Sequence, residues 1–259
     1  MDLQASLNVP FDGADRLDQL LGRASKRQLR APFGVYAFDT SVPALVELAL
    51  ATETELFTTE FGVSQADLVA EYWGYNDVSV WLLAVDHRTR TIAGVIRLIR
   101  PSGLGLASIT DITHQPWSMP LERVMAGSTL PADLASVWDI AILAVYKQYR
   151  RRVRQGSQIS FALYRGIFRV VAREHITHLV GIMVDPLLAR LQKLARPFET
   201  YDGITSRVHV GAPSTPVYMN VAEYRARLKR QIPALYALVM RGWGWFGQVA
   251  FIDCYGAGL

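Results

Sequence analysis

The sequence predicts a single-domain α/β protein with a central mixed, largely antiparallel sheet flanked by helices. Two apolar, β-branched segments, 78–85 and 91–99, are joined by the short polar segment 86–90, which is the pattern of an antiparallel hairpin. Segment 137–145 is apolar without alternation, which indicates a strand buried on both faces. Segment 157–173 then carries apolar residues at the spacing of one helix face. Strands and helices that alternate in this way are typical of an α/β sheet protein.

Shorter patterns divide the rest of the chain. Further strands are expected at 33–38, 178–184, 198–201, 208–210 and 217–221, and further helices at 42–51, at 64–71, from Asp185-Pro186, and from residue 222 with a break at Pro233. Segment 101–132 is rich in Gly and Pro and is expected to be a long loop. We therefore expect an N-terminal arm (1–30), a domain (31–221) and a C-terminal helical extension packed on the domain (222–259).

The composition indicates a globular protein of the cytoplasm. Hydrophobic residues make up 51% of the 259 residues and charged residues 19%, which is enough to bury a full core and excludes general disorder. Cys254 is the only cysteine, so no disulfide can form within the chain. The N-terminus lacks the pattern of a signal peptide. The apolar stretch 234–251 is interrupted by Arg241 and three glycines, which favours a packed element and leaves peripheral membrane contact open.

A cluster of basic residues follows the central strand. The net charge is only +4, but five of the eight residues from 147 to 154 are basic: Lys147, Arg150, Arg151, Arg152 and Arg154. Gly156 and Ser157 come next, where a helix is expected to begin. Guanidinium groups beside a helix N-terminus are suited to phosphate groups, so the segment predicts binding of a phosphate-bearing donor. A solvated charged turn is the alternative. Nucleic acid is disfavoured, because no aromatic residues interleave these charges.

Two charged residues stand out inside apolar strands. Asp139, near the start of the central strand, could accept the proton that an amine must lose before it attacks a carbonyl carbon. The alternative is a carboxylate that caps a loop or pairs with Arg97. Arg97 itself is costly to bury alone, so we expect it to pair with Asp139 or Asp111, or to bind a substrate carboxylate.

Several short motifs resemble the GNAT acyltransferase superfamily, and within it the branch of acyl-homoserine-lactone synthases and long-chain N-acyl amino acid synthases. The motifs are Gly94-x-x-Arg97-Leu98 with Pro101, the strand from Asp139 to Val145, and the run from Glu71 to Asp77. The resemblance covers roughly residues 60–200. The chain departs from the family pattern at six positions. Ile142 replaces an arginine, and Trp73 and Asn76 replace acids. Val153 and Gln155 fill positions where the phosphate loop usually has small residues, and Lys193 stands where a helix tyrosine often acts as general acid.

The resemblance implies an N-acyltransferase. It would move an acyl group, up to long-chain length, from acyl carrier protein or acyl-CoA to the amine of an amino-acid-like acceptor by direct attack. The donor would be acyl-CoA or acyl-phosphopantetheine, with no cofactor bound permanently. A donor- or carrier-protein-binding module without catalysis is the alternative. The N-terminal arm is then expected to close over the donor, so that deleting residues 1–25 would leave thermal stability nearly unchanged.

The resemblance also suggests a role for further residues. The main chain of the central strand would hold the thioester, at Ile142, Leu143, Ala144 and Val145. Arg97, Trp138, Phe161 and Phe168 are candidates for the substrate and acyl pocket, although aromatic residues at these positions are also typical of plain core. His175 and His178 have no neighbouring Cys or acid in the sequence that would complete a ligand set, so no metal is expected.

Overall fold

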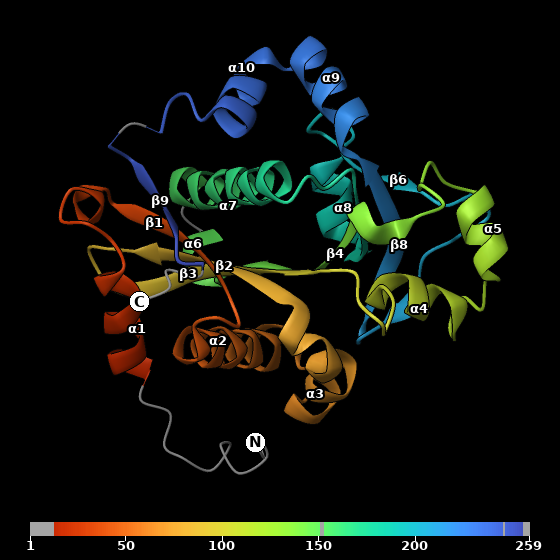
Figure 1. Cartoon of the computed structure of the whole chain (residues 1–259), viewed down its shortest axis with the longest axis horizontal. Coiled ribbons are helices and arrows are strands. Elements are labelled where there is room, and N and C mark those ends of the chain that lie inside the picture. Colours follow the sequence, from red (N-terminus) through yellow and green to blue (C-terminus); the bar gives the residue numbers. More distant parts are fainter. Residues whose placement is uncertain (1–12, 151–152, 246, 256–259) are drawn as a thin grey trace.

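The computed structural model describes residues 13–150, 153–245 and 247–255, and within them a nine-stranded sheet forms the centre of the molecule (Figure 1). The strands are β1 (Phe33–Asp39), β2 (Ser79–Asp86), β3 (Thr91–Ile99), β4 (Val137–Val145), β5 (His178–Val184), β6 (Glu199–Thr200), β7 (Arg207–His209), β8 (Ala212–Asn220) and β9 (Val249–Asp253). Their order is β6-β8-β5-β4-β3-β2-β1-β9, and β7 pairs with β8. The predicted mixed, largely antiparallel sheet is confirmed: only the pairs β4/β5 and β1/β9 are parallel.

Helices cover both faces of this sheet. The helix α7 (Val153–Arg173) lies on one face with α9 (Val221–Gln231) and α10 (Pro233–Tyr236), and α2 (Pro43–Phe61) lies on the other (Figure 1). The remaining helices are α1 (Gly13–Gly22), α3 (Gln65–Tyr72), α4 (Ala107–Thr113), α5 (Leu121–Ala126), α6 (Lys147–Arg150) and α8 (Asp185–Leu191). No helix in the described part of the chain is long and apolar enough to cross a membrane.

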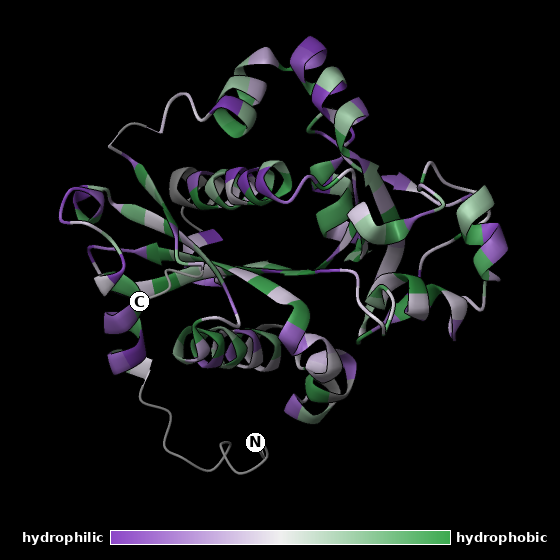
Figure 2. Cartoon of the chain, viewed as in Figure 1, coloured by the Kyte–Doolittle hydropathy of each residue, from purple (hydrophilic) through white to green (hydrophobic). Residues whose placement is uncertain are grey.

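The alternation of side chains along each strand divides the core into layers. In β2 every residue is buried: Leu82 and Ala84 pack with α7, whereas Trp81 and Leu83 pack with α2. Figure 2 shows the central strands as predominantly hydrophobic between the two helix layers. A third apolar cluster joins α4 and α5 to β5 and β8, and it includes Ile112. Burial of these faces is the main stabilising term of the fold.

The segment 101–132 differs from the expected loop. It contains α4 and α5, whose apolar residues Ile109, Ile112 and Val124 are buried. Both helices are shorter than eight residues and Pro residues lie between them, so their periodicity is too brief to be recognised in the sequence. The short helices give the second half of the sheet its own cover.

The two ends of the described chain also differ from expectation. In α1 the side chain of Leu20 is fully buried and Leu21 is 6% exposed, because the helix packs on α2. The region expected to be a helical extension contains β9, which runs parallel to β1 at the edge of the sheet. Its apolar run, 249–252, is only four residues long and follows three glycines, so the sequence pattern does not distinguish strand from helix.

These contacts predict that α1 contributes to stability. Replacing Leu20 by Ala should lower the free energy of unfolding by about 2–4 kcal/mol, because a fully buried leucine leaves a cavity. Leu29→Ala is the matched control, since Leu29 is 38% exposed. Urea unfolding followed by circular dichroism measures both. Equal stabilities for the two variants would show that α1 is a dispensable arm after all.

Candidate functional site

The sheet opens between β4 and β5. These parallel strands pair at Val137↔His178, Trp138↔Leu179 and Asp139↔Val180, and then the pairing ends. Gly181 lies at the point of separation, where an added Cβ would come within 3.0 Å of the carbonyl oxygen of Ile140. Beyond this point the strands diverge, and the facing edge of β4 has no strand partner there.

A bulge in β4 adjusts the side chains around the opening. The register with β3 shifts so that Arg97 pairs with Ile142 and Leu98 with Ile140, which leaves Ala141 as the extra residue. Ile140 and Leu143 consequently face the same side of the sheet, where both line an apolar pocket. Gly94 is required opposite, because a Cβ there would lie 2.7 Å from the carbonyl oxygen of Ala144.

A cavity of about 630 Å³ occupies the opening. It is lined by residues of β4, α6, α7 and α8, among them Leu143, Ala144, Val145, Phe161, Arg150 and Arg190. Arg150 and Arg190 approach it from different helices. Burial, and then the like charge of Arg190, lower the pKa of Arg150 below its usual value. Two guanidinium groups in one cavity form a site for an anionic group such as a phosphate.

An apolar pocket continues from this cavity into the core. Its volume is much smaller, about 40 Å³, and both spaces are lined by Leu143, Phe161 and Tyr164. Phe168 of α7 and Met219 of β8 also line it. Phe161 and Phe168 therefore lie where an acyl chain could follow. A long chain would require these side chains to move apart.

Asp139 occupies the last paired position before the opening. Its side chain is fully buried, and the main-chain amide of Ser108 donates to both carboxylate oxygens at 3.3 Å. Burial raises the pKa of Asp139 to about 7, although hydrogen bonds from Ser108 and Ala107 oppose the shift. A carboxyl group with this pKa can exchange a proton near neutral pH, as a general base must.

Tyr201 provides a second buried polar group in the same region. It is 1% exposed, and its hydroxyl group has no hydrogen-bond partner among the described residues. Burial raises its pKa, and the charge of Asp139 adds to the effect. A buried hydroxyl without a partner is unusual in proteins and is a group that a bound ligand or water would satisfy.

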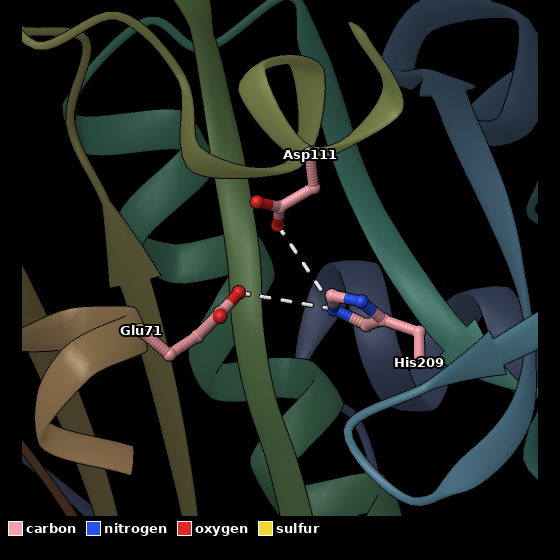
Figure 3. A group of neighbouring side chains, drawn as sticks. All are labelled: Glu71, Asp111 and His209. Atoms are coloured by element: carbon pink, nitrogen blue, oxygen red, sulfur yellow. Dashed lines mark ion pairs between the residues drawn. The ribbon is translucent and has the colours of Figure 1, made fainter. Parts of the chain in front are cut away.

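Glu71, Asp111 and His209 converge on the same face of the sheet as Asp139. They come from α3, α4 and β7 and point toward one another (Figure 3). His209 Nε2 lies 3.8 Å from a carboxylate oxygen of Glu71 and 4.0 Å from one of Asp111, so neither contact is a hydrogen bond. Each residue offers a ligand atom within 4.8 Å of the others, and the set could therefore hold a small cation, metal or ammonium.

The charge state of this acid–histidine cluster follows from its burial. Desolvation raises the pKa of Asp111 to about 8, and the neighbouring charge of Glu71 contributes. Burial also lowers the pKa of His209, against the attraction of Glu71. At neutral pH the imidazole is therefore uncharged and Asp111 keeps its proton, while the charge of Glu71 acts on both groups. The cluster has a net negative charge.

Arg97 is buried beside the site but does not face a free space. It forms an ion pair with Glu53 at 3.4 Å, donates to Ser79 Oγ at 2.8 Å, and donates to Asn76 Oδ1 at 2.8 Å. It also donates to the main-chain oxygen of Tyr72 at 3.0 Å. The carboxylate partner is thus Glu53, rather than Asp139 or Asp111. With 1% exposure and its donors engaged, Arg97 is a structural cation.

Among the other expected site residues, none of the side chains that the structure describes lines the cavity. Trp138 is 4% exposed, packs in the core under the guanidinium of Arg100, and does not line the cavity. The side chain of Ile142 is buried on the α2 face, so only its main chain can face the opening. Lys147 lies in α6. The helix α7 begins at Val153, so Arg154, Gly156 and Ser157 belong to its first two turns, and their side chains lie outside the described residues, as do Arg151 and Arg152 altogether.

Several residues of this region were not predicted as site residues. Arg190 lies in a segment with the ordinary pattern of an amphipathic helix. Tyr201 and His209 lie in short segments expected to be strands, and neither segment contains a motif. In the sequence, Glu71 lies in a family motif and Asp111 is a possible partner of Arg97, but no pattern predicts that the two acids share a site. Only the fold brings α3, α4 and β7 together, so no local pattern could have identified the cluster.

Comparison with known proteins identifies the fold. No model of a protein family and no curated protein matches the sequence. Among solved structures, a CoA-dependent acyl-homoserine lactone synthase, BjaI, with MTA is similar with a TM-score of 0.50 at 15% identity, over 78% of this chain and 88% of that one. The chain has the GNAT fold.

Further solved structures are similar at lower scores. FeeM, an N-acyl amino acid synthase from uncultured soil microbes, has a TM-score of 0.48 at 13% identity, over 73% of this chain and 92% of FeeM. An N-acetyltransferase from Lactobacillus plantarum, so described in its structure report, has a TM-score of 0.46 at 15% identity, over 73% and 98%. At these identities the likeness concerns the fold, so the activity must be argued from the site itself.

The environment of Asp139 predicts a pH-dependent gain in stability from Asp139→Asn. The pKa of about 7 in the folded state is above the value of 3.8 in the unfolded chain, so stability contributed by protonated Asp139 is lost as pH rises between these values. The neutral asparagine avoids this loss. Melting temperatures should therefore show a larger gain for the variant at pH 8 than at pH 5. A variant that is less stable at pH 8 than the natural protein would contradict the raised pKa.

Proposed function

We propose that the protein is an N-acyltransferase that moves an acyl group from a CoA thioester to a primary amine. One observation supports this above the others: the opening between β4 and β5 contains two guanidinium groups, connects to an apolar pocket, and has a buried carboxyl group at its apex. Along an acyl thioester of a phosphorylated carrier, the anionic phosphate groups come first, the reactive thioester follows, and the apolar acyl chain is last. The site matches each part in order.

The donor would be held at both ends. Arg150 and Arg190 would bind its phosphate groups, and the apolar residues around Phe161 would cover the acyl chain. The thioester would then lie along the edge of β4 from Ile142 to Val145, where main-chain N–H groups without a strand partner can polarise its carbonyl group. The sequence predicts an amino-acid-like acceptor, and acyl carrier protein is the alternative donor. Such donors belong to the cytoplasm, which is the location we propose.

The reaction requires proton transfer at two points. The acceptor arrives as an ammonium ion and gives one proton to ionised Asp139 or to a water bound to it. The free amine attacks the carbonyl carbon, a C–N bond forms, and the C–S bond then breaks. The second surplus proton leaves the nitrogen as the amide forms, and the departing thiolate takes up one proton. No acyl-enzyme is needed, so Cys254, which is buried and whose pKa burial raises to about 11, has no part in the step.

The role of Asp139 predicts a specific kinetic change. Asp139→Asn should lower kcat at least about tenfold, because the variant cannot accept the proton, while the affinity for octanoyl-CoA stays within about twofold. In the natural protein kcat/KM should rise with pH through about 7, as Asp139 ionises. Stopped-time assays by mass spectrometry measure amide formation from pH 5 to 9.

The inactive binding module is the opposing outcome of this assay. Tight binding of octanoyl-CoA without any amide product, for the natural protein and the variant alike, would show that the site binds donors and does not catalyse. Unchanged turnover in Asp139→Asn across the pH range would remove Asp139 from the chemistry.

The guanidinium pair predicts how the donor binds. Arg150→Gln with Arg190→Gln should weaken CoA binding about tenfold or more, because each arginine contributes charge-assisted hydrogen bonds to phosphate. The natural protein should also bind CoA less tightly at 500 mM than at 50 mM salt, since exposed charges are screened. Calorimetry with CoA measures both effects, with Arg207→Gln, an exposed arginine outside the cavity, as control.

A carrier-protein donor would show a different pattern in the same titrations. Acyl carrier protein would bind more tightly than CoA and lose more affinity in the double variant, because its acidic surface engages additional cations. If CoA binds equally well to the natural protein and the double variant, the phosphate site lies elsewhere.

A further inference from the structure

We propose that the acid–histidine cluster of Glu71, Asp111 and His209 binds the ammonium group of the acceptor and selects amines that lack a neighbouring carboxylate. This inference rests on the proposed function and names its acceptor class. The acceptors would be amines such as diamines or aryl-alkyl amines, rather than the corresponding amino acids.

The cluster lies directly over the reactive part of the sheet. Glu71 is the penultimate residue of α3, and the next residue, Tyr72, donates from its hydroxyl group to the main-chain oxygen of Ala141 at 3.4 Å. Ala141 is the bulged residue of β4, two positions after Asp139. The charge of Asp139 also acts on Asp111. An amine held by the cluster is therefore beside both the proposed base and the edge of β4 where the thioester would lie.

The charges around this position favour a cation and repel an anion. Glu71 and Asp111 form no ion pair with Lys or Arg among the described residues; their basic neighbour there is His209. Asp139 adds a third carboxyl group. A carboxylate on the acceptor would have to enter a half-buried site that already has net negative charge, which Coulomb repulsion makes unfavourable. The same negative charge attracts an ammonium group.

Among the residues that the structure describes, no buried arginine is available to reverse this preference. An amino acid acceptor would require a cation for its carboxylate, and Arg97 was the candidate. Its guanidinium is 1% exposed and is bound by Glu53, Ser79 and Asn76. Arg100, at the end of β3, is paired with Asp39 at 3.1 Å.

The spacing of the donor atoms agrees with a small cation between them. The gaps of 3.8 and 4.0 Å from His209 Nε2 exceed hydrogen-bond length, so each atom has room for a shared partner. An ammonium group donates three hydrogen bonds and carries a single charge. Asp111, whose pKa is raised to about 8, keeps its proton near neutral pH, and a divalent metal would have to expel that proton first. The monocation is thus the better match.

Trp117 completes the subsite. Its ring lies against the ring of His209, with centroids 5.4 Å apart, and its Nε1 donates to the main-chain oxygen of Thr205 at 3.0 Å. These contacts fix the imidazole in the orientation that faces the two acids. An indole ring also offers a favourable surface for a cation or for the apolar part of an amine.

The test compares acceptors that differ only in the carboxylate. Octanoyl-CoA is the donor, and the pairs are phenethylamine with phenylalanine, tyramine with tyrosine, and tryptamine with tryptophan, because each of these acceptors has a single amine. Amide product is measured by mass spectrometry at pH 7.5 with the full chain. In each pair the amine without carboxylate should have a kcat/KM at least about tenfold higher, as expected for removal of one charge repulsion in a half-buried site.

Two variants assign the preference to the cluster. Glu71→Gln removes the negative charge of the cluster, and Asp111→Asn removes a carboxyl group that can accept a hydrogen bond from the ammonium group. Each variant should reduce the amine-to-amino-acid ratio by at least about threefold, mainly through a higher KM for the amine. Glu122→Gln on α5 is the matched control, because Glu122 is exposed and outside the cluster; it should leave the ratio unchanged. An effect on folding alone would lower the activity on both members of a pair and would not change their ratio.

The outcomes separate the claims. Preference for the amino acids, or a ratio that the cluster variants do not change, overturns this inference and leaves the proposed acyl transfer intact. Absence of any amide from all six acceptors, with octanoyl-CoA bound, overturns the proposed function itself. Activity that requires added Zn²⁺, stops with a chelator and is lost in His209→Gln assigns the cluster to a metal and overturns the inference as well.

Discussion

The loss of pairing between β4 and β5 is the constraint on which the rest of the site depends. The two strands share three paired positions, and the pairing stops at Asp139, where Gly181 allows the last close approach. A parallel pair that separates in this way leaves main-chain groups of β4 without a partner from β5. Such groups are costly to bury unless a side chain, water or a ligand satisfies them. The cavity, the guanidinium pair and the apolar pocket all border the same opening.

A buried network holds the opposite face of the opening in shape. Arg97 connects Glu53 of α2, Ser79 at the start of β2, and the main-chain oxygen of Tyr72 at the end of α3. Breaking a buried ion pair leaves an uncompensated charge, so the arrangement resists distortion. Because Tyr72 also reaches the bulge of β4, the network fixes α3, and with it Glu71, over the reactive strand. A structural cation thus positions the acids of the proposed acceptor subsite.

The sequence predicted the sheet better than it predicted the site. β2, β3, β4 and β5 are continuous apolar segments, whose burial is visible without any knowledge of neighbours. The placement of Asp139 at a buried strand follows from the same pattern. The partner of Arg97 was not predictable, because Glu53 lies in a helix that looked shorter in the sequence than it is. His209 and Arg190 gain meaning only from packing, since their elements are short and carry no motif.

We propose the opening between β4 and β5 as the donor site, with Asp139 at its apex. A crystal structure with a thioether analogue of octanoyl-CoA tests it most directly. We expect the phosphate groups between Arg150 and Arg190, and the acyl carbon beside the main chain of Ile142 to Val145 on β4. An analogue bound on another face of the protein, with the opening unoccupied, would contradict the claim.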